Sequence, residues 1–107
     1  MDNPLRRDVA ELADFLAQAG EIRMANRART ALDGDSSELE SYLASNELWG
    51  GAGSVADQAC GADRSPSRRR LESLLIRLGR GQVSRGIANP RTTTWIEAFE
   101  RWTRGDI

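Results

Sequence analysis

Three prolines divide this chain into helical segments, because each of them follows a residue that caps helices well. The dipeptides are Asn3-Pro4, Ser65-Pro66 and Asn89-Pro90. Proline is favoured at the first position of a helix because its missing N–H would have no partner there. Asparagine and serine are favoured immediately before that position. We therefore predict that helices begin at about residues 4, 66 and 90.

The spacing of apolar residues predicts two helices in the first third of the chain. The first segment places one narrow apolar stripe on a helix, made of Leu5, Val9, Leu12, Leu16 and Ala19. Beyond Gly20 the apolar residues lie on the opposite face, at Met24, Ala25, Ala28, Ala31 and Leu32. Either the helix breaks near Gly20, or one long helix packs on two sides. Because glycine costs about 1 kcal/mol inside a helix, we expect a bend or short break at Gly20. Gly34 is expected to stop the second helix.

Two further helices are expected in the middle of the chain. Asp35 or Ser37 can cap the first of them, which should end at Gly50-Gly51. One side of this helix carries Leu39, Tyr42, Leu43 and Asn46, with Trp49 nearby. Ser54 can cap a second, short helix, in which Asp57 stands three residues on and which Gly61 ends.

The residue pattern in the last third of the chain predicts two more helices. The segment 66–86 has a core stripe of Leu71, Leu74, Leu75 and Leu78 and an opposite face of Arg69, Arg70, Arg77 and Arg80. Gly79 and Gly81 weaken this helix, so its second half is expected to bend or end early. The last helix groups Trp95, Ile96, Ala98, Phe99 and Trp102 on one side.

No segment alternates between apolar and polar residues, so the predicted fold is all-α. We expect a small compact bundle of five to six helices, without a sheet, as a single domain over residues 1–107.

The residue types missing from the sequence argue against an enzyme. The chain has no histidine, all fifteen of its basic residues are arginine, and Cys60 is its one cysteine. It therefore lacks the usual general base, the lysine of Schiff-base and phosphate-loop chemistry and the ligands of common zinc sites. We expect no catalytic residue, no cofactor and no metal. Cys60 cannot form an internal disulfide and is expected to be a small buried side chain.

The chain also lacks the apolar segments that direct proteins to membranes. No run of apolar residues is long enough to span a bilayer. The first fifteen residues, MDNPLRRDVAELADF, are charged throughout and lack the apolar stretch of a secretory signal. We expect a cytoplasmic protein with no membrane partner.

Charge is strongly separated along the middle of the chain. Residues 35–63 carry six acidic and no basic residues, whereas residues 64–91 carry eight arginines and one acid, Glu72. One interpretation is that the two segments pack side by side and neutralise each other. In a second, the face formed by Arg69, Arg77 and Arg80 binds a protein partner, since arginine is enriched at interfaces. Nucleic acid is a third possible partner, although the acidic segment would repel phosphates if it lay nearby.

A glycine-rich turn precedes the predicted short helix. Backbone N–H groups at such a turn can bind an anion, and the residues concerned here are Trp49, Gly51, Gly53 and Ser54. The alternative is a connector in which Gly50 ends one helix and Ser54 caps the next. The stretch SNELWGGAGSVADQA, residues 45–59, resembles segments of short bacterial proteins, and the resemblance implies no activity.

Two other groups of residues have both a structural and a functional interpretation. Trp95, Phe99 and Trp102 are expected to pack in the core, the alternative being a dimer or partner interface, where tryptophan contributes strongly. Asp8, Glu11 and Asp14 on the outer side of the first helix are expected to be a solvated face, because a bundle of this size has little room for a catalytic cleft.

These observations favour a small non-enzymatic protein–protein interaction module that can also bind copies of itself. The expected contacts are the aromatic side of the last helix or the arginine face of residues 66–86. The alternative is a nucleic-acid-associated regulator that uses the same arginine-rich helix.

Overall fold

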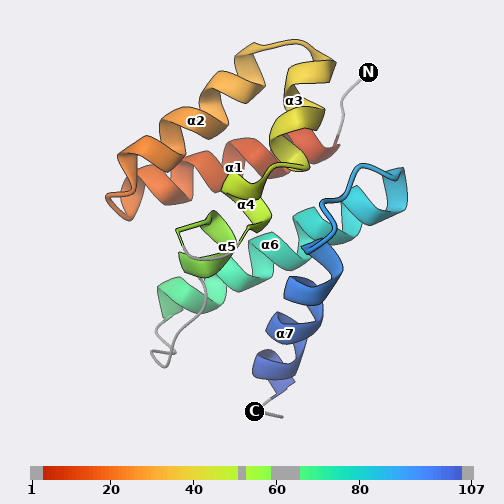
Figure 1. Cartoon of the computed structure of the whole chain (residues 1–107). Coiled ribbons are helices and arrows are strands. Elements are labelled where there is room, and N and C mark those ends of the chain that lie inside the picture. The colour runs from red at the N-terminus through yellow and green to blue at the C-terminus, as the bar shows by residue number, and fades with distance from the viewer. Residues whose placement is uncertain (1–3, 51–52, 59–65, 105–107) are drawn as a thin grey trace.

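A computed structural model describes residues 4–50, 53–58 and 66–104, and the described residues form seven helices and no strand (Figure 1). The helices are α1 (Pro4–Gln18), α2 (Ile22–Asp33), α3 (Ser36–Leu43), α4 (Asn46–Trp49), α5 (Val55–Gln58), α6 (Pro66–Arg85) and α7 (Thr92–Arg104). Five of them have eight residues or more, whereas α4 and α5 have four residues each. The predicted all-α bundle is confirmed.

The break predicted at Gly20 is confirmed, because α1 ends at Gln18 and α2 begins at Ile22. Gly20 has a φ of 85°, a left-handed conformation that glycine adopts without strain. The turn lets the apolar stripes of α1 and α2 face the same core. Ala19, expected in the stripe of the first helix, is exposed because it lies in this turn.

Arg6 of α1 fixes the far end of the α1–α2 pair. Its guanidinium donates to the carbonyl oxygen of Leu32 at 2.8 Å and to that of Gly34 at 3.4 Å. The last carbonyls of a helix have no partner within the helix, so Arg6 supplies donors and a positive charge at the C-terminus of α2.

The single helix expected between residues 36 and 49 is divided into α3 and α4. Asp35 is the cap of α3, since its carboxylate accepts from the backbone N–H of Glu38 at 2.9 Å. Ser45 then interrupts the helix, donating from its hydroxyl to the Tyr42 carbonyl at 2.6 Å and accepting from the N–H of Leu48 at 3.4 Å. This second cap restarts the helix in a new direction, and Asn46 is exposed as a result.

Helix α6 continues without interruption to Arg85, so the expectation that Gly79 and Gly81 would bend or end it is wrong. The glycines are instead the points where neighbouring elements approach α6. A Cβ atom at Gly79 would lie 2.6 Å from Cδ1 of Ile96 and 3.1 Å from Cη2 of Trp49. Packing against these neighbours offsets the low helix propensity of glycine.

The start predicted for the last helix was two residues early, since α7 begins at Thr92 and Pro90 lies in a turn. The carboxamide oxygen of Asn89 accepts from the N–H of Arg91 at 2.8 Å, which closes this turn before the helix starts. Its NH2 group donates to the Ala44 carbonyl at 2.8 Å and to Oδ1 of Asn46 at 3.1 Å. Asn89 therefore ties the start of α7 to the junction of α3 and α4.

Helix α6 crosses the middle of the molecule, with α1 and α2 on one side of it and α7 on the other (Figure 1). Trp49 of α4 is fully buried against α6, and its Nε1 donates to Oε1 of Gln82 at 2.9 Å. Gln82 is also fully buried, and its NH2 group donates to the Leu43 carbonyl at 2.7 Å and to the Ile87 carbonyl at 3.1 Å. The Gln82 side chain thus has a partner for each of its polar atoms, as a buried amide requires.

Candidate functional site

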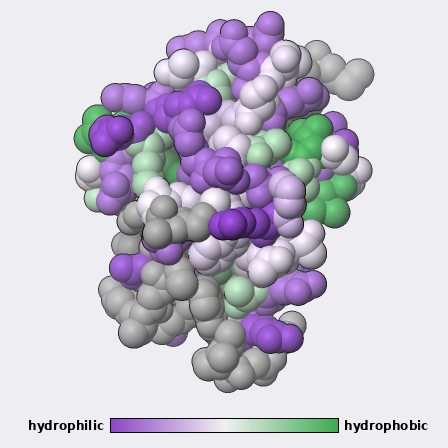
Figure 2. All heavy atoms as spheres, in the orientation of Figure 1, coloured by the Kyte–Doolittle hydropathy of each residue, from purple (hydrophilic) through white to green (hydrophobic). Residues whose placement is uncertain are grey.

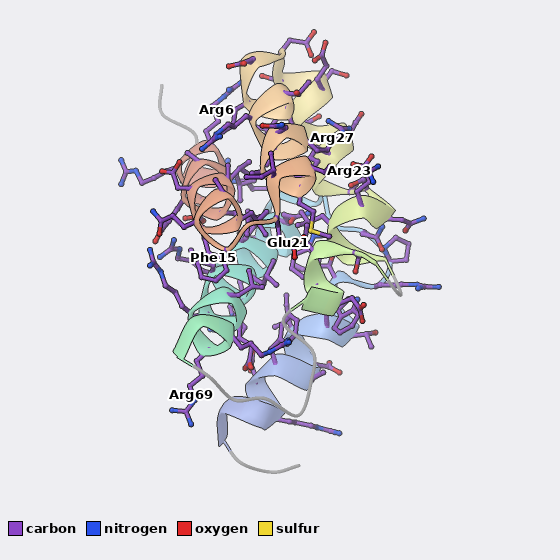
Figure 3. The ribbon with its side chains drawn as sticks, turned by 90° about the vertical axis from the view of Figure 1, so that its left-hand side faces the viewer. Arg6, Phe15, Glu21, Arg23, Arg27 and Arg69 are labelled. Atoms are coloured by element: carbon purple, nitrogen blue, oxygen red, sulfur yellow. The ribbon has the colours of Figure 1, made fainter. Side chains whose placement is uncertain are left out.

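An open groove lies between the start of α2, helix α4 and the glycine turn, and it encloses about 450 Å³. Its lining residues are Glu21, Arg23, Met24, Arg27, Glu47 and Gly53. Sites that bind ligands commonly enclose about 300–1,000 Å³, so the groove is large enough to take several side chains. Figure 3 shows Glu21 just before the start of α2, and Arg23 and Arg27 following it along the first part of that helix.

Arg27 is held in the groove by two contacts. Its Nε lies 3.0 Å from Oε2 of Glu47, and its guanidinium carbon lies 5.3 Å from the centre of the Tyr42 ring. The ring face attracts the cation, while Glu47 neutralises it from across the groove. Arg23 lies one helical turn earlier on α2, is exposed, and forms no ion pair with any described residue.

Tyr42 lies beneath this arginine and is almost completely buried, with 1% of its surface exposed. Its hydroxyl has no hydrogen-bond partner among the described residues. Burial raises the pKa of the Tyr42 hydroxyl well above its usual range, and the negative charge of Glu47 adds to this, while Arg27 opposes it. Tyr42 is therefore a neutral phenol whose buried polar group is unsatisfied.

We predict that Tyr42→Phe raises the free energy of unfolding by about 1 kcal/mol, because an unsatisfied buried hydroxyl costs roughly 1–3 kcal/mol. The wild-type protein should also lose stability above pH 10, the ordinary tyrosine pKa. There the unfolded chain loses the tyrosine proton while the folded chain keeps it. Urea unfolding of both proteins at neutral and alkaline pH tests this. A less stable Tyr42→Phe protein at neutral pH would contradict it.

The contacts at the glycine turn are those of a connector between helices. Ser54 and Asp57 form a reciprocal cap, because the N–H of Asp57 donates to the Ser54 hydroxyl at 3.1 Å and the N–H of Gly53 donates to the Asp57 carboxylate at 3.1 Å. Trp49 is fully buried and does not line the groove. The N–H of Gly53, which an anion bound at this turn would need, already donates to the Asp57 carboxylate. Gly51 lies outside the described residues.

Two arginines on the exposed face of α6, Arg77 and Arg80, are neutralised by acids of α1 and α7. Arg77 pairs with Asp8 at 2.9 Å and also with Glu11, and Arg80 pairs with Glu100 at 2.6 Å. Arg77 and Arg80 therefore pair with acids of α1 and α7, and not with acids of residues 35–63, the segment expected to neutralise the arginines of residues 64–91.

Two of the three carboxylates expected as a solvated face thus hold Arg77, and the Asp8 side chain is only 14% exposed. Burial lowers the pKa of Arg77, but the hydrogen bond to Glu11 and the charges of Asp8 and Glu11 raise it more, so the net pKa lies above its usual range. The third acid, Asp14, pairs with Arg29 at 3.3 Å.

Arg69, the remaining member of the predicted arginine face, is exposed and pairs with no described residue (Figure 3). The structure therefore does not bring Arg69, Arg77 and Arg80 together as three free cations. Only Arg69 is available without breaking an existing ion pair.

Two of the aromatic residues of α7, Trp95 and Phe99, have described side chains that pack against the rest of the molecule. Phe99 is fully buried in the core, so it is not an exposed contact for a partner. Trp95 is half-buried, stacks on Phe99 at 5.5 Å, and donates from its Nε1 to the carbonyl of Trp49 at 3.0 Å. The side chains of Trp102 and Cys60 lie outside the described part of the structure.

Exposed apolar surface is sparse among the described residues. The large hydrophobic residues that are exposed are Ile22, at 54%, and Val83, at 49%. Figure 2 shows a mostly hydrophilic face with hydrophobic atoms gathered at two separate edges. This face therefore shows no continuous apolar patch of the kind that marks a large hydrophobic interface.

Sequence reasoning missed the groove, although one local signal pointed to it. Arg23 and Arg27 are one helical turn apart and flank Met24, so they share a side of α2. The partner across the groove, Glu47, is twenty residues away from Arg27, and its approach depends on how α4 packs. The sequence of α2 alone does not predict the contact between Arg27 and Glu47.

Comparisons add no functional assignment to this geometry. Among the described residues, no three His, Cys, Asp or Glu side chains are grouped so that they could hold a metal ion. None of the described helices combines the length and the apolar character needed to cross a membrane. The chain matches no protein-family model, no curated protein and no solved structure, so it is placed in no family.

Proposed function

We propose that the chain is a small non-enzymatic protein-binding module whose groove between α2 and α4 takes a segment of another protein. The observation that carries the proposal is the pairing of an open 450 Å³ groove with an exposed arginine, Arg23, that has no partner in the described structure. The proposed binding site is therefore on α2, and not on the aromatic side of α7 or the arginine face of α6, which the sequence favoured.

The chemistry of the lining supports a protein partner. Met24 offers a flexible, polarisable side chain that adapts to different partners, and arginine is enriched at protein interfaces. The chain lacks histidine and lysine, which leaves few groups for acid–base or covalent catalysis. A binding function needs none of these groups.

Nucleic acid is less well supported as the partner. A nucleic acid carries a phosphate at every nucleotide, so a strand lying along the groove would also meet Glu21, which lines it and would repel the phosphates. On α6, Arg77 and Arg80 are already paired with carboxylates, so binding DNA there would require those pairs to be given up.

The proposal predicts that Arg23→Glu abolishes binding of peptides selected on the wild-type chain from a displayed library of random linear peptides. Arg69→Glu is the matched control, because Arg69 is also exposed and forms no ion pair with the described residues, but lies on α6. Fluorescence anisotropy of the selected peptides measures binding, and circular dichroism checks that both variants fold.

Other outcomes assign a different site or partner. Binding lost in Arg69→Glu and kept in Arg23→Glu would move the site to α6. Salt-sensitive binding of duplex DNA, with no peptide selected, would favour the nucleic-acid function. A particle mass that doubles with concentration in light scattering would identify the partner as a second copy of the chain.

A further inference from the structure

The ion pair between Arg27 and Glu47 bears on the chemistry of the segment that the proposed function places in the groove. We infer that this segment is acidic, and that one of its carboxylates binds Arg23 and Arg27 in place of Glu47. The inference rests on the proposed function and adds the class of ligand to it.

Glu47 shows where such a carboxylate binds. It reaches from α4 across the groove and accepts a hydrogen bond from Nε of Arg27. Both side chains remain substantially exposed, at 40% for Arg27 and 57% for Glu47. Exposed ion pairs stabilise a fold only slightly, so an incoming carboxylate can displace Glu47 without disturbing the packing of α4.

Arg27 stays in position when Glu47 leaves, because its second contact is independent of the acid. The guanidinium lies over the buried ring of Tyr42, which cannot move away without opening the core. The cation is therefore held in place before the partner arrives, which reduces the ordering that binding requires.

Arg23 supplies a second donor group on the same side of α2. Residues four apart on a helix have Cβ atoms about 5–6 Å apart, which lets two long arginine side chains converge on one carboxylate. Arginine binds carboxylates through paired N–H groups. Since Arg23 has no ion pair in the described structure, a partner's acid gains this contact without replacing another.

Glu21 sets the direction of the bound segment. It lines the same groove beside the α1–α2 turn, away from Arg27 (Figure 3). A second carboxylate at that end would be repelled. The segment is therefore expected to be acidic where it meets Arg23 and Arg27, and neutral or basic where it meets Glu21.

Peptides selected on the full wild-type chain test the inference through their sequences and their response to two variants. Glu47→Gln removes the competing carboxylate and is expected to strengthen binding about two- to fivefold. Arg27→Gln is expected to weaken it by roughly tenfold or more. Glu38→Gln is the control, because Glu38 is an exposed acid of α3 that does not line the groove.

The peptides should be rich in Asp and Glu, and replacing those acids by their amides should abolish the gain from Glu47→Gln. Peptides that depend on Arg23 but show no preference for acids, or that bind Glu47→Gln more weakly, would overturn the inference and leave the proposed function standing. If no selected peptide depends on Arg23, both fail.

Discussion

Trp49→Ala is expected to lower the free energy of unfolding by about 3–5 kcal/mol, the usual cost of truncating a large buried aromatic. Trp49 has no exposed surface, and its ring lies between α4 and α6, close to Gly79. Removing it leaves a cavity there and deprives Gln82 of its donor. Since domains of this size are stable by only about 5–15 kcal/mol, this variant should be close to unfolding at physiological temperature.

Trp49→Phe separates the loss of the hydrogen bond from the loss of volume. Phenylalanine keeps most of the buried ring but leaves the amide oxygen of Gln82 without the indole donor, which should cost roughly 1–3 kcal/mol. Urea unfolding followed by far-ultraviolet circular dichroism measures both variants. A cost below about 1 kcal/mol for Trp49→Ala would mean that the tryptophan is not at the centre of the core.

Gly79→Ala is expected to destabilise the protein by about 1–3 kcal/mol, the range for overpacking a core, although alanine is the better helix former. The added methyl group would lie 2.6 Å from Cδ1 and 2.9 Å from Cγ1 of Ile96, and 3.1 Å from the Trp49 ring. These contacts should outweigh the gain of about 1 kcal/mol that alanine gives in a helix.

Gly81→Ala is the matched control on the same helix. Its Cβ atom would approach one side chain, that of the buried Leu5, with Cδ2 at 2.8 Å and Cγ at 4.0 Å, so a small rotation of this terminal methyl group relieves the contact. This variant should be unchanged or more stable by up to about 1 kcal/mol. Ile96→Val removes the Cδ1 atom and should recover part of the loss in Gly79→Ala. Equal stabilisation by both glycine replacements would contradict the close approach at Gly79.

The candidate site was harder to anticipate than the helices that carry it. Arg69, Arg77 and Arg80 share a helix face in sequence, yet acids of α1 and α7 neutralise two of them. The aromatic side of α7 was expected to be core or interface, and Phe99 lies in the core. These outcomes depend on which residues of the other helices lie opposite each side chain, and the sequence of one helix does not predict that.

Most helix ends could be predicted from the amino-acid sequence, because the signals that set them are local. Pro4 and Pro66 start α1 and α6, Gly20 separates α1 from α2, and Asp35 and Ser54 cap the helices that follow them. Each of these effects acts within about one helical turn. The information is therefore carried by a few consecutive residues.

The way the helices meet, and with it the position of the groove, depends on contacts between residues of different helices. The sequence around Gly79 predicts low helix stability there, but in the folded protein the side chains of Ile96 and Trp49 pack closely against this glycine. Arg27 meets Tyr42 because α3 packs against α2, and it meets Glu47 because Ser45 redirects the chain between α3 and α4. Contacts between residues distant in sequence depend on the packing of whole helices, whose stability comes mostly from the faces they bury together.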